Sequence, residues 1–583
     1  MRKIYSTLLV ACAVGAIGAN ANDLTTPRFE WANLLQGSTT SDQSIAVIAN
    51  ADGEVYNLSA MGTQDGQTAV TYGGATLYEG TAFAAANPNL TLLKTNADGT
   101  AAWVVYSTSG DLANDGAMAQ TGDGDVVFAA KMRHTNGKLD QDLSFVDATG
   151  ASHVIDWKAG DNRSYRMVIG KVSAQGAIKW VRSYAIENGK APAGTKDNTP
   201  DAISVKALAV DNAGNIYVGG DYSMPITFPV ADGADRVLTP ANTAAWNGDH
   251  QSGYAADMLL VKLDANGYFL DYVPMTDAVM TRQTIFNIEY DKGHFYLYGT
   301  AQAAEDGTTA NLSGVQVTAN KALSPFVACL DANLSGVWAK SMSMEGVAGG
   351  SPAIQNVGLS VIGDYLWLAG QYNGKITCGD KSVSSVTKST REGCLIKMEK
   401  VNGAWLAAAN SRDSFKTGLA STGLTGYYKV VGNPNIKDKV YVWGYVMNKA
   451  VGVFLRPYNA NDLTADENAA WNLATEGGVP TACQVAYVPD NNRIYFMARG
   501  NKDFTLYDGG TANGNAVANW DLVLASYTIP GAEFTSGVDD IAADNAAGAD
   551  NAAVYDLYGR QMPAGARLAP GVYVKGGKKL LVR

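Results

Sequence analysis

The sequence has little of what most enzymes and nucleic-acid-binding proteins need. Only 17% of its 583 residues are charged, and the formal net charge is −11. An acidic balance argues against a general nucleic-acid partner, which requires a basic footprint. Downstream of the N-terminus no stretch approaches the ~20 consecutive apolar residues of a membrane-spanning helix, so no transmembrane span is predicted. With 46% hydrophobic residues the chain is nevertheless expected to fold.

Histidine and cysteine are also scarce, with four and five residues respectively. No H-E-x-x-H, G-x-S-x-G or Walker A motif occurs, and no two cysteines have C-x-x-C spacing. Asp-containing turns such as residues 211–215 lack the ligand set of a calcium loop and are interpreted as β-turns. We therefore predict no metal and no cofactor. Carboxylates brought together from distant strands could still serve a glycoside hydrolase or lyase.

Both ends of the chain differ from its middle. Arg2 and Lys3 precede an apolar stretch, and Ala19-Asn20-Ala21 has the form of a cleavage site, so residues 1–21 are predicted to be a signal peptide. Lipidation at Cys12 is the alternative. Residues 531–552, rich in Ala, Asp, Asn and Gly, are predicted to be a linker. Residues 553–583 are predicted to form three short strands.

The last 31 residues contain Val554-Tyr555-Asp556-Leu557-Tyr558-Gly559-Arg560, then Leu568-Ala569-Pro570-Gly571-Val572-Tyr573-Val574. This run resembles the second half of the C-terminal sorting domain of the type IX secretion system. The resemblance implies a partner in that secretion machinery and a location outside the cell or on the outer-membrane surface, with the periplasm as an alternative. The first half of such a domain is poorly represented.

Between the ends, a set of strand signatures recurs about every 73 residues. An alternating strand, a tight turn and a Tyr- and Val-rich strand are clearest at residues 207–220. A third strand follows, as at residues 259–267, and a fourth carries Trp in most copies. The copies of the first pair lie at residues 44–62, 116–131, 207–220, 286–299, 357–370, 428–444 and 482–500, and the tryptophans are Trp103, Trp180, Trp338, Trp405 and Trp471.

Seven repeats of four strands predict an all-β fold, a seven-bladed β-propeller spanning residues 22–530. The last repeat lacks a fourth strand, whereas residues 28–35, which contain Trp31, precede the first repeat without a partner. We expect this N-terminal strand to complete the last blade and so remove an exposed edge.

The best copy, residues 205–275, contains Ala209-Val210-Asp211-Asn212-Ala213-Gly214-Asn215-Ile216-Tyr217-Val218-Gly219 and, later, Val261-Lys262-Leu263-Asp264. This pattern resembles the bacterial propeller family known as the SBBP repeat. The resemblance implies the fold and no particular activity, because these repeats are not tied to one reaction.

Successive strands of a blade run antiparallel, so connections between the second and third strands and between repeats share one face, here called the long-loop face. The long insertions fall there, as at residues 132–165 and 221–256. Insertions on one face of a repeat array often mark a binding surface, although tolerated decoration is the alternative. The candidate ligand-binding residues are Trp157, Arg163, Tyr222, Trp246, His250, Arg282, Tyr372, Arg412 and Tyr445.

Cys378 and Cys394 belong to one repeat and form a candidate disulfide. The favoured function is an exported, non-enzymatic propeller that binds a protein or a glycan through the long-loop face. The alternatives are a propeller glycoside hydrolase or lyase with carboxylates at the channel mouth, and a structural scaffold of the cell envelope.

Overall fold

The computed structural model is all-β, and its strands pair antiparallel in a series of sheets. No helix in the described part of the chain has the length and apolar character needed to cross a membrane. The structure describes residues 24, 26–37, 42–62, 69–79, 88–133, 142–155, 165–186, 203–241, 256–278, 280–347, 351–385, 392–410, 425–446, 452–465, 471–476, 481–499, 504–508, 511–516, 521–530, 554–556, 571–575 and 578–582.

The chain divides into two compact units, residues 1–532 and 533–583. In the smaller unit, β43 (Val554–Asp556), β44 (Gly571–Lys575) and β45 (Lys578–Val582) form one antiparallel sheet with β44 in the middle. Three strands thus lie where the sequence predicts three strands.

In the larger unit, each repeat forms a sheet whose strands follow chain order. The clearest repeat gives β14 (Ile203–Val210), β15 (Ile216–Tyr222), β18 (Asp257–Leu263) and β19 (Phe269–Tyr272). The turn after β14 forms because the Asp211 carboxylate accepts hydrogen bonds from the backbone N–H groups of Ala213 and Asn215, both at 2.9 Å.

The other repeats have the same strand order. The first two sheets contain β2 (Gln43–Ala49), β3 (Val55–Met61), β6 (Asn89–Thr95) and β7 (Ala101–Ser107), and β8 (Asp111–Gln120), β9 (Val126–Arg133), β12 (Arg166–Val172) and β13 (Ile178–Ile186). Later sheets contain β21 (Arg282–Asp291), β22 (His294–Gln302), β25 (Ser324–Asp331) and β26 (Gly336–Ser341); β28 (Ala353–Ile362), β29 (Tyr365–Asn373), β32 (Glu392–Glu399) and β33 (Trp405–Asn410); β34 (Thr425–Val431), β35 (Lys439–Val446), β36 (Val453–Asn459) and β37 (Trp471–Glu476); and β38 (Thr481–Val488), β39 (Arg493–Arg499) and β42 (Leu522–Thr528).

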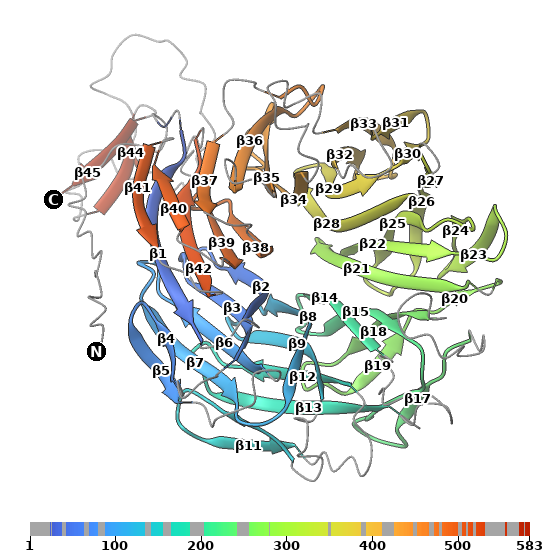
Figure 1. The fold of residues 1–583 in the computed structure, drawn as a ribbon, viewed down its shortest axis with the longest axis horizontal. Coiled ribbons are helices and arrows are strands. Elements are labelled where there is room, and N and C mark those ends of the chain that lie inside the picture. The colour runs from blue at the N-terminus through green and yellow to red at the C-terminus, as the bar shows by residue number, and fades with distance from the viewer. Residues whose placement is uncertain are drawn as a thin grey trace, which may run out of the picture. The chain divides into compact units, whose positions relative to one another are not determined.

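The first strands of the repeats surround a common centre, and the sheets radiate from it (Figure 1). The hydrophobic core lies between neighbouring sheets, as where Val127 and Ile169 of one repeat pack with Val205 and Val218 of the next. One such cluster joins the last repeat to the first. This arrangement is a β-propeller.

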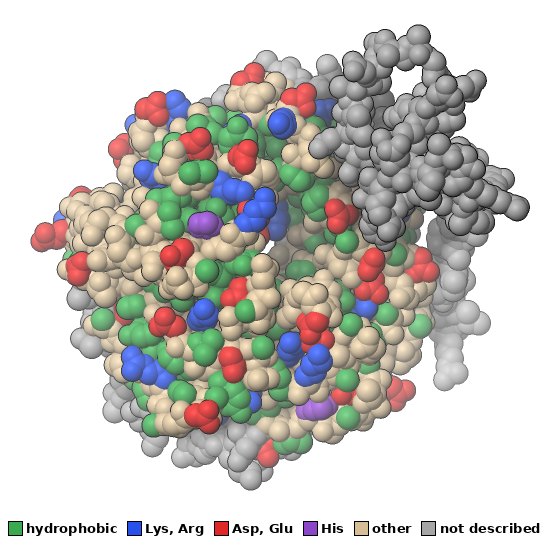
Figure 2. Space-filling view, turned by 180° about the vertical axis from the view of Figure 1, so that it is seen from behind, with side chains coloured by type: hydrophobic (Ala, Val, Ile, Leu, Met, Phe, Trp, Pro, Cys, Tyr) green, Lys and Arg blue, Asp and Glu red, His purple; other side chains and the backbone are tan. Residues whose placement is uncertain are grey.

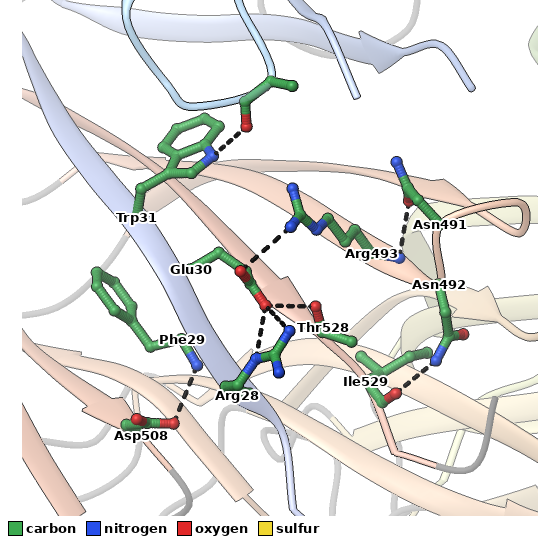
Figure 3. Close-up of polar contacts among 11 residues, drawn as sticks. Arg28, Phe29, Glu30, Trp31, Asn491, Asn492, Arg493, Asp508, Thr528 and Ile529 are labelled. Carbon is green, nitrogen blue, oxygen red and sulfur yellow. Dashed lines mark hydrogen bonds and ion pairs between the residues drawn. The ribbon is translucent and has the colours of Figure 1, made fainter. Parts of the chain in front are cut away.

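The N-terminal strand β1 (Arg28–Gln36) pairs with β42 of the last repeat, as the sequence predicts. The paired residues run from Arg28 and Thr528 to Leu35 and Leu522. Glu30 is central to this seam (Figure 3), because its carboxylate accepts hydrogen bonds from Thr528 Oγ1 at 2.6 Å and from Arg493 at 3.2 Å. Burying the edge of β42 in this way satisfies its backbone groups.

Tryptophans near the start of several fourth strands lock one sheet to the next. The indole N–H of Trp31 donates to the Ala97 carbonyl at 2.9 Å, in the turn before β7 (Figure 3). Trp103 donates to Ala174 at 3.0 Å and Trp180 to Ala265 at 3.1 Å, each in the corresponding turn of the following repeat. We call this contact the tryptophan latch.

The latch also requires a glycine in the receiving turn. Gly99 has a φ of 83°, and a Cβ atom added there would lie 2.5 Å from Cδ2 of Trp31. Gly176 and Gly267 meet Trp103 and Trp180 in the same way. These turns therefore need glycine both for the left-handed backbone and for space.

The pairing register between the third and fourth strands divides the five tryptophans into two groups. Trp103 and Trp180 pair with Lys94 and Lys171 of their third strands, and Trp338 occupies the matching place opposite Cys329. Trp405 pairs instead with Met398, one position further along the third strand, and Trp471 pairs with Leu455. Sequence spacing grouped these five residues, but strand register divides them.

The inserted segments between second and third strands have a structural role that the sequence did not indicate. Each described insertion contains a hairpin that pairs with the fourth strand of the preceding repeat, or with a short strand that follows it, and not with a strand of its own sheet. The added pairs are β4 (Ala69–Tyr72) and β5 (Ala75–Glu79) on β1; β10 (Leu143–Val146) and β11 (Ser152–Ile155) on β7; β16 (Ile226–Phe228) and β17 (Arg236–Leu238) on β13; β23 (Thr308–Leu312) and β24 (Val315–Ala319) on β20 (Met275–Thr276), which follows β19; β30 (Lys375–Cys378) and β31 (Lys381–Ser384) on β27 (Ser343–Glu345), which follows β26; and β40 (Phe504–Asp508) and β41 (Thr511–Ala516) on β37.

Replacing Gly99 with alanine tests the latch. The new methyl group would displace the Trp31 ring, so we expect a loss of about 1–3 kcal/mol beyond the cost of the left-handed backbone. Gly293→Ala is the matched control, because Gly293 also has a φ of 83° but no atom lies within 4 Å of its added Cβ. Chemical denaturation of both variants measures the difference. Equal destabilisation of the two would contradict the latch.

Candidate functional site

The first strand of every repeat carries a β-bulge in its first half, toward the long-loop face. The register shifts lie, for example, between Val205 and Ala207 in β14 and between Ile285 and Asn287 in β21. A bulge adds one residue and re-aims its side chain. Matching bulges occur in β2, β8, β28, β34 and β38.

Two of these bulges supply the partners of a charged cluster. Asp115 lies in the bulge of β8 and Lys206 in that of β14, and their side chains form an ion pair. A second oxygen of Asp115 lies 3.6 Å from the ammonium of Lys131, at the end of β9. Lys131 is 5% exposed and Lys206 is 29% exposed. The cluster therefore extends from the protein interior to the solvent.

Asp221 adds a second carboxylate to this cluster. It lies at the end of β15 and accepts a hydrogen bond from Thr284 Oγ1, in the neighbouring repeat, at 2.9 Å. Burial raises the pKa of Asp221, whereas the Thr284 hydroxyl and the positive charges of Lys206 and Arg282 act in the opposite direction. Arg282 is exposed at the start of β21. The charged cluster thus consists of Asp115, Lys131, Lys206, Asp221 and Arg282.

A second acidic group lies where the first and last repeats meet. Asp42 is fully buried and accepts backbone hydrogen bonds from Gly62 at 2.7 Å and from Gly37 at 3.1 Å. Burial and the nearby charge of Asp521 raise the pKa of Asp42 to about 8, although the two N–H groups and Arg499 oppose the shift. Asp521 accepts a hydrogen bond from Gln36 at 3.1 Å.

These two groups differ in what they could do chemically. Asp42 is enclosed, and both of its oxygens are occupied by backbone donors, so it suits a structural role at the seam. The charged cluster reaches the surface through Lys206 and Arg282, so it can contact a ligand. Among the described residues no group of His, Cys, Asp and Glu has the arrangement of a metal site.

The structure distributes the candidate binding residues unevenly. Tyr222 and Tyr372 are 5% and 1% exposed, and their rings belong to the hydrophobic clusters between sheets, which argues against ligand contact. Arg282 is exposed and belongs to the charged cluster. Tyr445 lies in β35, but its side chain is outside the described part. Trp157, Arg163, Trp246, His250 and Arg412 lie outside the described residues.

Sequence reasoning missed Asp115, Lys131, Lys206 and Asp221. An alternating strand pattern gives no sign of a bulge, because one or two extra residues leave hydrophobicity almost unchanged. A lysine within the alternating strand at residues 203–210 was the available signal.

The candidate disulfide is absent. Cys378 and Cys394 are both free, buried thiols in one hydrophobic cluster between sheets. They lie near the ends of β30 and β32, and burial raises the pKa of each thiol to about 12. A protonated, enclosed thiol is a poor nucleophile and packs as a small apolar group.

Charges on the surface are mixed. Figure 2 shows acidic and basic side chains interspersed over the described part of one face, around a central opening.

Comparisons with known proteins give only distant similarities. No family model matches the chain, and no curated protein matches it. A protein of unknown function from Dyadobacter fermentans has 11% identity and a TM-score of 0.35, covering 87% of this chain and 100% of its own. The polysaccharide lyase Uly1 has 9% identity and a TM-score of 0.40, with coverages of 91% and 96%. Quinohemoprotein alcohol dehydrogenase from Comamonas testosteroni has 11% identity and a TM-score of 0.36, with coverages of 88% and 78%. None of these similarities is high enough to argue an activity.

The raised pKa of Asp42 predicts a pH dependence of stability. Between about pH 4 and pH 8 the unfolded chain loses this proton while the folded protein keeps it, so unfolding releases a proton and becomes easier as pH rises. The free energy of unfolding should therefore decline over this range, by at most about 1.4 kcal/mol per pH unit. Asp42→Asn should flatten the decline in denaturation experiments. Asp232→Asn, at an exposed turn, is the control, and equal pH profiles for the two variants would contradict the assignment.

The burial of the two thiols predicts that they react slowly with thiol reagents. At pH 8 a thiol reagent should leave Cys378 and Cys394 unmodified in the native protein and modify both after denaturation. Peptide mass analysis without reductant measures the outcome. A cross-linked peptide pair, lighter by two hydrogens, would show the disulfide instead.

Proposed function

We propose that this protein is an exported, non-enzymatic propeller of seven four-stranded blades that binds a protein or a glycan through its long-loop face. The observation that carries the proposal is the charged cluster at that face. Two bulges direct Asp115 and Lys206 toward each other, and Arg282 remains exposed beside Asp221. Arginine in such a place can pair with carboxylates or donate to several acceptors at once.

The strand orders support the proposed blade number. Six repeats each supply four strands in the order of the chain, and the last supplies three, with β1 as its fourth. The resemblance of residues 205–275 to the SBBP repeat agrees with this architecture. We propose residues 22–530 as the propeller and residues 531–552 as a linker.

The proposal that the protein is exported is based on the two ends of the chain. Residues 1–21 have the pattern of a signal peptide, with lipidation at Cys12 as the alternative. Residues 553–583, which resemble a type IX sorting domain, would engage that secretion machinery. The protein would then reach the outer-membrane surface or the medium, or the periplasm if the tail is not used.

The two carboxylates of the charged cluster, Asp115 and Asp221, favour one alternative, a glycoside hydrolase or lyase. Burial raises the pKa of Asp221, as a proton donor requires, and Asp115 supplies a second carboxylate, which is paired with lysine. The ion pairs that occupy Asp115 count against this reading, because they would compete with a substrate. A scaffold in the cell envelope is a third alternative and requires no ligand.

Binding to a glycan array and to envelope proteins, with purified full-length protein, tests the proposal. Arg282→Ala should weaken binding of any ligand found about tenfold, equivalent to about 1.4 kcal/mol. Lys437→Ala is the control, because Lys437 is also exposed but lies in the short turn between β34 and β35, on the opposite face. A ligand whose affinity is unchanged by Arg282→Ala would exclude this part of the long-loop face. Turnover of an array glycan by wild-type protein would favour the enzyme.

A further inference from the structure

One fourth strand differs from all the others in the described part of the chain. Six of the repeats have a hairpin added to their outer edge, each contributed by the next repeat. The sheets that end at β19 and β26 are followed by the short strands β20 and β27, each of which pairs with a hairpin, whereas no described strand pairs with the outer edge of β33. The next repeat cannot supply a hairpin, because only residues 447–452 lie between β35 and β36. A hairpin with two three-residue strands and a two-residue turn already needs about eight residues.

The outer edge of β33 has the properties of a pairing site. Ala407, Ala408 and Ala409 are half-buried, and among the described residues they pair only with β32, on the inner side. Proteins usually protect such edges with lysine, proline or an added element. The sequence of β33, Trp-Leu-Ala-Ala-Ala-Asn, has no charge and no proline.

Exposed apolar residues accompany this edge. Leu406 in β33 is 39% exposed, and Val401 in the preceding turn is 76% exposed, the highest value among the large apolar residues described. The hairpin β30–β31 approaches β33 near Trp405, where an added Cβ on Gly379 would lie 3.0 Å from the ring. That hairpin forms its ladder with β27, and its strand β31 also lies against β33.

The six hairpins show what kind of strand such an edge accepts. The strand that pairs in each case contains an apolar residue, then Thr, Ser or Asn, then a second apolar residue. In the first hairpin, Val70 and Tyr72 are buried on either side of Thr71, which pairs with Gln36. The other five copies are Leu143-Ser144-Phe145, Ile226-Thr227-Phe228, Ala310-Asn311-Leu312, Ile376-Thr377-Cys378 and Phe504-Thr505-Leu506.

The physical basis of the motif is the alternation of side chains along a strand. In β16, Ile226 and Phe228 are fully buried and contribute to a cluster between sheets, while Thr227 pairs with Ala185. In β30, Ile376 is fully buried and Thr377 pairs with Ser343. Backbone hydrogen bonds would attach the strand, and the two apolar residues would fill the space beneath it.

We propose that the outer edge of β33 binds an extended segment of a partner protein by strand addition, in the manner of the six hairpins. The partner segment carries an uncharged motif of two apolar residues separated by Thr, Ser or Asn, and it runs antiparallel to β33. This surface is separate from the charged cluster and does not depend on the function proposed above.

A hairpin of the chain itself is the probe. A fluorescein-labelled synthetic peptide of residues 142–155, which contains Leu143-Ser144-Phe145, is titrated into full-length protein and followed by anisotropy. We expect saturable binding of one peptide per chain. Hydrogen exchange should slow at Ala407–Ala409 and not at β7, whose edge is already paired with β10. The same peptide with Ser144→Pro loses a backbone donor and should bind at least about tenfold more weakly.

Two protein variants locate the site independently. Neighbouring residues of a strand direct their N–H groups to opposite sides, so one of Ala408→Pro and Ala409→Pro removes an outward donor and the other removes a bond to β32. The variant that retains the wild-type denaturation midpoint should lose peptide binding about tenfold or more. If neither variant folds, the peptide control and the exchange data decide.

Three results would overturn the proposal. The first is no saturable binding of the wild-type peptide. The second is binding that leaves exchange at Ala407–Ala409 unchanged. The third is a dimer that dissociates when peptide is added, which would identify a second copy of this chain as the occupant.

Discussion

The pairing of β1 with β42 is the constraint on which the rest of the structure depends. A ring of sheets has no natural end, and an unsealed ring would expose the edge of β42 and the face of the first repeat. The chain seals this gap with residues that are nearly 500 positions apart, as in the hydrogen bond from Thr528 to Glu30. The same strand brings Trp31 to the Gly99 turn, so closure and the tryptophan latch are formed by neighbouring residues.

Two further devices join successive sheets around the ring. Tryptophan latches fix the start of a fourth strand to a turn of the following repeat, and transferred hairpins pair with the end of that strand or with a short strand that follows it. Both connect one repeat to the next, so each sheet is held by contacts that its own residues do not supply alone. Repeat proteins depend on such nearest-neighbour interfaces. The insertions that sequence analysis assigned to a binding surface are therefore, in their described parts, largely structural.

The sequence predicted what periodicity can reveal. Alternation and turn residues located the first three strands of each repeat, and the leftover strand with Trp31 predicted closure. Periodicity could not reveal the hairpins, because a strand of three or four residues gives too short a pattern and its partner lies in another repeat. It could not reveal the bulges that place Asp115 and Lys206 together. Tyr222 and Tyr372 were chosen as contact residues because an aromatic residue at a strand end looks the same in sequence whether it is buried or exposed.

Native-state hydrogen exchange of the β1 amides tests the central claim most directly. If β1 is an integral strand of the last sheet, its protected amides will exchange only through the opening that also releases β42, with the same free energy and the same dependence on denaturant. Exchange of β1 at a far lower free energy, while β39 and β42 remain protected, would contradict the closed ring.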